Sequence, residues 1–159
     1  MRIEVLIVDF GSQYTRLIFH KLLYKLNVDV ELIDYLTFEK IYKSDLKKNY
    51  PNLKSIILSG GPQSITDNKL NLDLKYLEDY TILGICYGAQ LIAYNYGCKL
   101  ETYHNSEFGS TLIKKNREHE IFNNIFGNFT VFMSHNDSLK EISNEIEIIS
   151  TTENNVPAI

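Results

Sequence analysis

Residues 81–97 read TILGICYGAQLIAYNYG, an apolar run followed by a turn and then a helical pattern. The run predicts a buried strand, and the pattern over 87–96 predicts a helix. Between the two elements, Cys86 stands between Gly84 and Gly88. The spacing G-x-C-x-G is the thiol counterpart of the G-x-S-x-G nucleophile elbow, in which small flanking residues allow a sharp turn that exposes the side chain.

The position of Cys86 favours a chemical role over a packing role. A residue between the carboxyl end of a parallel strand and the next helix lies where α/β folds bind ligands. The helix N-terminus also favours the thiolate over the thiol. The alternative is a small buried hydrophobe, as most free cysteines are. We predict that Cys86 is a nucleophile and that Cys98, which lies beyond the helix end, is structural.

A thiolate that attacks a carbonyl creates an oxyanion, which backbone N–H groups usually stabilise. The N–H of Tyr87, directly after the cysteine, is one predicted donor. Gly61 is the second, in the loop SGGPQS (59–64) that follows the apolar run 55–58. A plain turn is the alternative, since Gly-Pro commonly marks one. Two loops converging at one end of a sheet favour the oxyanion hole.

The same loop permits a competing interpretation as a phosphate site. SGGPQS resembles the SGGxDS loop of ATP pyrophosphatases, but Gln63 stands where that motif has an aspartate. A glycine loop with one mismatch is weak support for nucleotide binding.

The segments before the cysteine alternate between strand and helix patterns. Apolar runs of strand type lie at 3–8, 28–33 and 55–58, and helical patterns lie at 14–22 and 36–50. This alternation predicts an α/β fold of the flavodoxin-like type, an open and mostly parallel sheet with helices on both faces.

The segments after the helix change character. Short apolar stretches at 110–115, 128–133 and 146–150 are separated by turn residues. They predict antiparallel strands at one edge of the sheet. We expect one domain over 1–159.

Composition excludes several classes of function. The chain has 159 residues, 44% of them hydrophobic, and a net charge of −4, so no basic surface indicates nucleic acid. No apolar run approaches the roughly 20 residues of a membrane span, and the first residues do not form a signal peptide. Two cysteines twelve positions apart form neither a disulfide framework nor a zinc motif. We predict a cytoplasmic protein with no membrane or nucleic-acid partner.

Four stretches carry a resemblance to a known family: DFGSQYTRLI (9–18), ILSGGPQSI (57–65), GICYGAQLIA (84–93) and MSHNDSL (133–139). With these motifs the chain resembles class I glutamine amidotransferases, and most closely the glutaminase domain of GMP synthases. The tyrosine after the cysteine and the DFGSQYT opening are typical of that subfamily, and EFGS (107–110) fits a further segment.

The resemblance implies a glutaminase reaction. Cys86 would attack the side-chain amide of L-glutamine, ammonia would leave, and water would hydrolyse the glutamyl thioester. The ammonia would pass to an ATP-pyrophosphatase domain or subunit outside this chain, where ATP and Mg²⁺ support the amination of XMP to GMP. No cofactor or metal is implied within this domain.

The resemblance also assigns substrate-binding residues. Gln90, one helical turn after Cys86, would hold the glutamine. The amino-acid end of the substrate would be lined by Ser134, His135, Asn136 and Asp137. Asn136 replaces a glycine of the family motif, and we expect a mild effect because Asn tolerates a left-handed backbone.

One departure from the family is larger. Its members end the domain with a His-x-Glu pair that supplies the general base, and no such pair occurs in the 159 residues. His20 and His119 are predicted to be surface residues, and His104 lies in an expected polar loop. His135 belongs to the substrate motif and is not expected to be the base.

The chain ends in TTENNVPAI (151–159), a newly started apolar segment. We therefore expect the natural protein to continue with the missing pair, and the 159 residues alone to be inactive.

Three alternative functions share these residues. A non-catalytic, glutamine-sensing domain of the same fold would explain the missing pair. Another class I amidotransferase, of the anthranilate or carbamoyl-phosphate type, would differ in its ammonia acceptor. A cysteine hydrolase on the same fold is disfavoured by Gln90 and by the MSHND motif.

Overall fold

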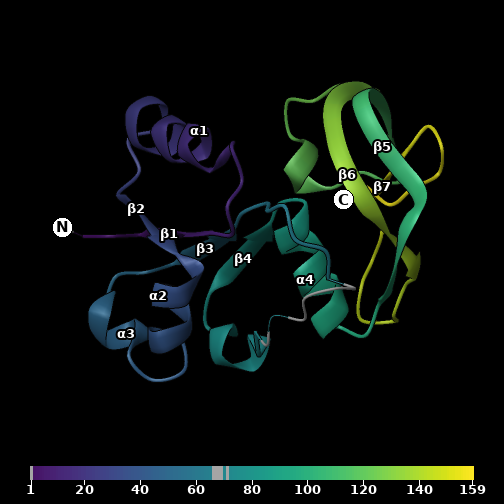
Figure 1. Ribbon diagram of the computed structural model, residues 1–159. Coiled ribbons are helices and arrows are strands. Elements are labelled where there is room, and N and C mark those ends of the chain that lie inside the picture. Colours follow the sequence, from purple (N-terminus) through teal and green to yellow (C-terminus); the bar gives the residue numbers. More distant parts are fainter. Residues whose placement is uncertain (1, 66–69, 71) are drawn as a thin grey trace. The chain divides into compact units, whose positions relative to one another are not determined.

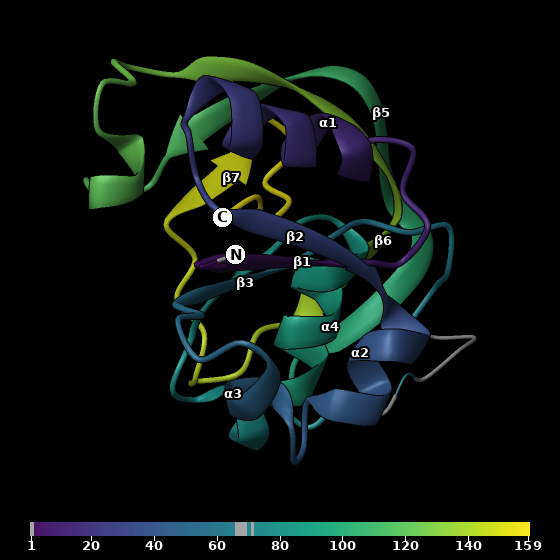
Figure 2. The ribbon, with the colours of Figure 1, turned by 90° about the vertical axis from the view of Figure 1, so that its left-hand side faces the viewer.

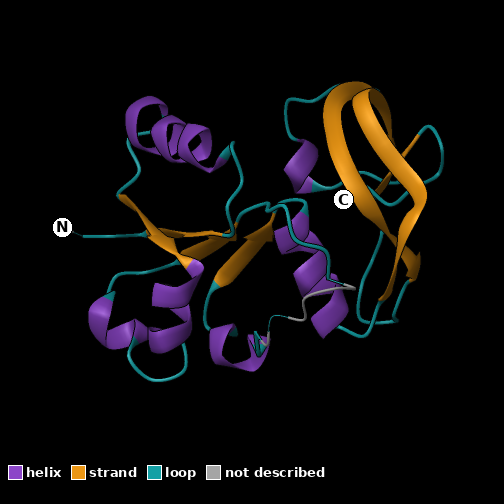
Figure 3. Ribbon diagram, in the orientation of Figure 1, coloured by secondary structure: helices purple, strands orange, loops and turns teal. Residues whose placement is uncertain are grey.

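The computed structural model describes residues 2–65, 70 and 72–159, and for residues 102–105 it describes the backbone alone. The chain divides into two compact units, Met1–Asn95 and Tyr96–Ile159. Figure 3 shows helices and strands mixed in the first unit and a strand-rich second unit.

The first unit alternates strands and helices as predicted. Its strands are β1 (Val5–Asp9), β2 (Val30–Asp34), β3 (Ser55–Leu58) and β4 (Thr81–Gly84). Its helices are α1 (Thr15–His20), the π-helical turn η1 (Lys21–Lys25), α2 (Tyr35–Ile41), α3 (Leu46–Asn49), the 3₁₀ turn η2 (Leu74–Leu77) and α4 (Tyr87–Asn95). The single helix expected over 36–50 is therefore wrong. Residues 42–45, Tyr-Lys-Ser-Asp, separate α2 from α3, because Ser and Asp favour turns over helix interiors.

The four strands form one parallel sheet in the order β2-β1-β3-β4, which confirms the predicted α/β fold. Parallel sheets are covered on both faces. Figures 1 and 2 show α1 over one face of the sheet and α2 and α4 on the other. Ile7, Val30 and Ile57 form a buried cluster against which side chains of α1 and η1 pack. This order places β4, which leads to the cysteine, beside β3, which leads to the glycine loop.

The second unit is an antiparallel sheet of three strands in the order β6-β5-β7. The strands are β5 (Lys99–Lys115), β6 (Phe129–Glu141) and β7 (Ser150–Thr152), and a 3₁₀ turn η3 spans Glu120–Phe122. The predicted antiparallel strands are confirmed, but they pair with one another in a sheet of their own. Mutual pairing extends β5 and β6 well beyond the apolar stretches that predicted them, since neighbouring strands can override local preference.

Two local predictions in the second unit are wrong. His104, expected in a loop, lies within β5, and only its backbone is described. Of the strand predicted at 146–150, only Ser150 belongs to β7, because β7 has ladder partners on β5 for three residues alone. Within the described part of the chain, no helix combines the length and apolar character needed to cross a bilayer.

Candidate active site

The predicted elbow is present between β4 and α4. Cys86 is exposed and has a φ of 51°, in the left-handed region. The other described non-glycine residues with positive φ are Asn27, Asn124 and Asn155, and asparagine tolerates this conformation. Cys86 has no such tolerance. Backbone strain of this kind persists only where the surrounding structure fixes it, and it concentrates at functional sites.

Steric crowding requires glycine at positions 84 and 88, on either side of Cys86. A Cβ added at Gly88 would lie 2.1 Å from the carbonyl oxygen of Leu58, and one at Gly84 would lie 2.5 Å from the backbone nitrogen of Ala89. Both distances are far below van der Waals contact. The start of α4 therefore packs directly on the end of β3, and only glycine fits at either position.

Backbone hydrogen bonds hold this turn in place. The N–H of Ile85 donates to Leu58 O (2.9 Å), and that of Gly88 donates to Ser59 O (3.0 Å). The carbonyl of Cys86 accepts from the N–H of Gln90 (3.0 Å). Cys86 is thus fixed from both sides at the N-terminus of α4, where the helix dipole favours an anion.

The glycine loop after β3 approaches Cys86. A Cβ built on Gly60 would lie 3.5 Å from the Cβ of Cys86. The buried Ser59 hydroxyl fixes the loop, accepting from the N–H of Phe10 (3.0 Å) and donating to the carbonyl of Gly60 (2.8 Å). The predicted convergence of the two loops is confirmed. Gly60, adjacent to the predicted Gly61, is the glycine in contact with the cysteine, and the sequence interpretation gave it and Ser59 no role.

The loop after β1 completes the same end of the sheet. The carboxylate of Asp9 accepts from the N–H of Gly11 (2.8 Å) and from the hydroxyl of Thr15 (2.8 Å). Ser12 of this loop lies against Gly60, 3.5 Å from its hypothetical Cβ. This arrangement gives the DFGSQYT motif a physical role, because it shapes the loop that packs on the glycine loop.

Gln90 belongs to the same group by position. It is half-buried on α4, and its backbone N–H donates to the carbonyl of Cys86, which directly precedes the helix. Among the predicted residues, Cys86, Tyr87 and Gln90 thus lie in one continuous segment, whereas Gly61 lies in the glycine loop, where it is the neighbouring Gly60 that approaches Cys86.

The remaining predicted residues lie on β6 of the second unit. Successive side chains of a strand point to opposite faces, and here Ser134 and Asn136 are exposed, whereas His135 and Asp137 lie on the buried face. The four side chains do not share one surface. Asn136 lies in a strand and is not among the residues with positive φ. The extended strand does not require a residue that tolerates a left-handed backbone, and the mild effect of replacing glycine stays a prediction.

Comparison with known proteins decides the family. The model for the glutamine amidotransferase class-I family matches residues 6–159. The chain belongs to the class I glutamine amidotransferase family. Crystal structures agree. One assigned to a GMP synthase subunit of Thermoplasma acidophilum has a TM-score of 0.76 at 28% identity, covering 96% of this chain and 74% of that one. A glutamine amidotransferase of Thermotoga maritima, with a TM-score of 0.72 at 19% identity, shares the fold.

Among curated proteins, the amidotransferase chain resembles GMP synthase (glutamine-hydrolysing) of Petrotoga mobilis, with 38% identity over 96% of the chain. The corresponding protein of Mesoplasma florum is 36% identical over 98% of the chain. The chain spans 29% and 30% of the length of these two relatives.

Tyr87 of the amidotransferase chain is buried, with none of its surface exposed. Its ring packs edge-on against that of Phe10, 5.3 Å between centroids. Burial raises the pKa of the Tyr87 hydroxyl to about 12. The hydroxyl has no hydrogen-bond partner among the described residues. The side chain therefore anchors α4 in the core, which leaves the backbone as the part of Tyr87 available to a substrate.

The histidines of the amidotransferase chain differ in their surroundings. His20 and His119 are exposed, as predicted, and the Nδ1 of His119 accepts from the N–H of Ile121 at the start of η3. His135 is mostly buried, with its Nε2 3.4 Å from the Glu107 carboxylate. Its Nδ1 is inaccessible to solvent, so neither nitrogen is open to a substrate. Glu107 was missed because only the fold brings it opposite His135.

The second cysteine has the structural role predicted for it. Cys98 is buried, and its sulfur accepts from the N–H of Ser143 at 3.3 Å. The two thiols of the amidotransferase chain therefore differ sharply in access. Across the described residues, no group of three His, Cys, Asp or Glu side chains is placed to hold a metal ion.

Proposed function

We propose that this chain is the glutaminase component of a GMP synthase, hydrolysing L-glutamine through Cys86. The observation that carries the proposal is the exposed Cys86 at φ 51°, held in an elbow that only glycines at 84 and 88 permit. Family membership supports the reaction, and the GMP synthase relatives support the pathway.

The chemistry follows from the elbow. The Cys86 thiolate forms a carbon–sulfur bond to the side-chain amide carbon, and the carbonyl oxygen becomes an oxyanion. Backbone N–H groups of Tyr87 and of Gly61 in the glycine loop stabilise that charge. When the intermediate collapses, the carbon–nitrogen bond breaks, and the nitrogen takes a proton from the protonated general base proposed below and leaves as ammonia. The same base then takes a proton from water, which attacks the thioester, releases glutamate and regenerates the thiolate.

Substrate binding divides between the predicted residues. Gln90, in the first turn of α4 after Cys86, holds the glutamine. Ser134 and Asn136, on the exposed face of β6, contact its amino-acid end. His135 and Asp137 act from the buried face and support that segment of strand.

The general base and the ammonia acceptor are proposed to lie outside the 159 residues. The matched Thermoplasma chain and the GMP synthase relatives both extend beyond the aligned part. We propose that the wider protein supplies a His-x-Glu pair beside Cys86. An ATP-pyrophosphatase part uses ATP and Mg²⁺ to aminate XMP with the released ammonia.

Intact-mass measurement before and after incubation with the glutamine analogue diazo-oxo-norleucine tests the nucleophile. We expect a single adduct, mapped by peptide analysis to Cys86, that is absent from Cys86→Ala and retained in Cys98→Ala. Glutamine should slow the labelling. Absence of an adduct on Cys86 in the folded protein would contradict the glutaminase and favour a non-catalytic domain.

The acceptor is tested separately. Extended to include the proposed His-x-Glu pair and added to a GMP synthase ATP-pyrophosphatase domain, the protein should release glutamate faster when XMP, ATP and Mg²⁺ are present together. Stimulation by chorismate or by a bicarbonate-dependent system instead would assign it to another class I amidotransferase.

A further inference from the structure

A buried carboxylate lies beneath the proposed substrate segment of β6. We propose that Glu107 is a positioning residue: its carboxylate holds the His135 imidazole and thereby sets the backbone of the Ser134–Asn136 segment that receives the amino-acid end of glutamine. This inference rests on the proposed glutaminase function and extends it to a residue that does not touch substrate.

The Ser134–Asn136 segment needs side-chain support because the regular pairing of β5 with β6 is interrupted beside it. Along β5 and β6 the register runs regularly from Ile113 to Glu107, which faces His135, and then shifts before it resumes at Thr102, which faces Asp137. Residues 103–106 of β5 thus stand opposite Asn136 alone. Ladder interruptions of this kind leave residues unpaired and are common beside functional sites.

Side chains replace the missing ladder contacts. The Oε1 atom of Glu107 accepts from the side-chain amide of Asn154 at 3.1 Å. The buried Oε2 atom has no hydrogen-bond partner among the described residues, and Nε2 of His135 lies 3.4 Å from it. The hydroxyl of Ser106 donates to the carbonyl of Asn136 at 3.3 Å. Glu107 therefore connects β6 to the turn after β7 at the point where β5 no longer pairs regularly with β6.

Because Glu107 and His135 are buried, their contact determines which ring nitrogen of His135 carries the proton. Only 4% of the Glu107 side chain and 15% of the His135 side chain are exposed. A buried carboxylate requires compensating donors, and the nearest imidazole nitrogen, Nε2, must carry its proton to act as one. Glu107 thus selects the Nε2–H tautomer and the ring orientation of His135, as carboxylates do for histidines at many sites.

The alternation of side chains on β6 explains how the orientation of His135 affects the proposed substrate contacts. His135 points inward between Ser134 and Asn136, whose side chains are exposed. Fixing the inward ring fixes the peptide groups on either side of it. We expect loss of the donor on residue 135 to weaken glutamine binding without changing the reactivity of Cys86.

The test compares two replacements of His135. In His135→Gln the side-chain amide can take the place of the Nε2–H group as donor to Glu107, whereas His135→Leu packs without a donor. Glutamine affinity is measured by calorimetry in a Cys86→Ala background, and labelling by diazo-oxo-norleucine at saturating reagent is measured with Cys86 intact. We expect His135→Gln to bind within about threefold of the parent and His135→Leu at least tenfold more weakly, with equal maximal labelling rates.

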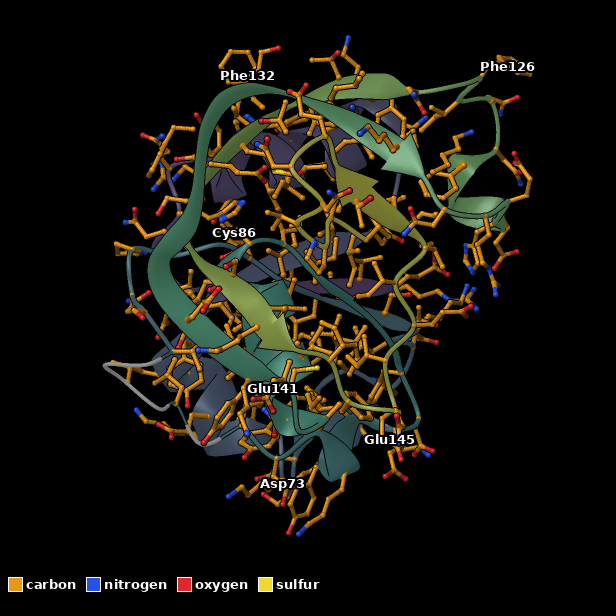
Figure 4. All side chains as sticks on the ribbon, turned by 90° about the vertical axis from the view of Figure 1, so that its right-hand side faces the viewer. Asp73, Cys86, Phe126, Phe132, Glu141 and Glu145 are labelled. Atoms are coloured by element: carbon orange, nitrogen blue, oxygen red, sulfur yellow. The ribbon has the colours of Figure 1, made fainter. Side chains whose placement is uncertain are left out.

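Glu107→Gln is the second variant and Glu141→Gln its matched control. Glu141 also lies on the β5–β6 pair, but it is exposed, pairs with Lys99 at 2.8 Å and is seen at the surface in Figure 4. We expect long-range ¹H–¹⁵N spectra to show a single Nε2–H tautomer for His135 in the parent and in Glu141→Gln, and mixed tautomers in Glu107→Gln.

The outcomes separate the two proposals. Equal glutamine affinity in folded His135→Leu and His135→Gln, or an unchanged tautomer in Glu107→Gln, overturns the positioning role. If the parent binds no glutamine and Cys86 is not labelled, the glutaminase proposal fails, and the inference about substrate fails with it. Glutamine binding by the parent with no loss in His135→Leu rejects the positioning role alone.

Discussion

The two regions assigned to glutamine are held in place by different means. Around Cys86 the backbone itself is constrained, by two obligatory glycines, a left-handed residue and hydrogen bonds to the ends of neighbouring strands. Around His135 the backbone ladder is interrupted, and side-chain contacts of the buried Glu107 with His135 and with the exposed Asn154 take its place. The backbone constraints leave the proposed nucleophile little conformational freedom, whereas single side chains can adjust the strand that is proposed to bind substrate.

The largest expected effect comes from filling the space at the elbow. In Gly88→Ala the new methyl group would overlap the backbone of Leu58, and backbone cannot move aside as a side chain can. We expect a loss of about 3 kcal/mol in the free energy of unfolding. Labelling of Cys86 should fall at least tenfold.

Urea unfolding and labelling kinetics measure both quantities. The matched control is Ala89→Gly, at the exposed next position of α4, which should cost about 1 kcal/mol through helix propensity and leave labelling intact. If Gly88→Ala were as stable and as reactive as the parent, the elbow would not depend on close packing against β3.

This contrast also explains what the sequence could predict. The elbow is encoded within a few residues, so G-I-C-Y-G indicated the strand, the turn, the helix and the nucleophile together. The parallel sheet followed from alternating local patterns. By contrast, Glu107 and Asn154 are 47 positions apart, and no local pattern joins them.

Long-range pairing accounts for the remaining differences. The lengths of β5 and β6 and the place of His104 in a strand depend on how the two segments align. The sequence predicted Gly61 at the cysteine, whereas the structure places Gly60 there. Both residues are glycines, so only the geometry of the turn distinguishes them. Asn136 was interpreted through a glycine in the family motif, although the strand conformation makes no demand for one.

The side-chain network should be nearly as sensitive to loss of a single donor. Asn154→Ala removes the donor to one oxygen of a buried carboxylate, so we expect a loss of about 2 kcal/mol in the free energy of unfolding. The exposed Asn144→Ala should change it by less than about 0.5 kcal/mol. In a Glu107→Gln background the effect of Asn154→Ala should shrink. A full and additive effect there would show that Asn154 acts independently of Glu107.

The elbow should gain stability when its strain is removed. Cys86→Gly relieves the left-handed backbone, whereas Cys86→Ala removes the thiol and keeps the strain. We expect the glycine variant to be more stable than the alanine variant by about 1 kcal/mol in thermal or urea unfolding. At Cys98, whose φ is not positive, the same pair should rank in the opposite order. If the glycine variant were the more stable one at both positions, or at neither, backbone strain at Cys86 would not explain the difference.

The smallest effect concerns the hydroxyl buried behind the elbow. Burial raises the pKa of Tyr87 to about 12, above the value of about 10 expected in the unfolded chain. The protonated hydroxyl is therefore favoured in the folded state, and its contribution is complete below about pH 10 and disappears as the pH rises toward 12.

Tyr87→Phe should leave stability at neutral pH unchanged or raise it by about 1 kcal/mol, because an unpartnered buried polar group is removed. Between pH 10 and 12 its stability should fall less steeply than that of the parent, as measured by urea unfolding at each pH. Tyr24→Phe, at an exposed tyrosine, is the control and should follow the parent. A steeper fall in the free energy of unfolding of Tyr87→Phe than of the parent between pH 10 and 12 would mean that the ionised hydroxyl has a stabilising partner in solution. A side-chain contact of Tyr87 would then help to hold this end of α4.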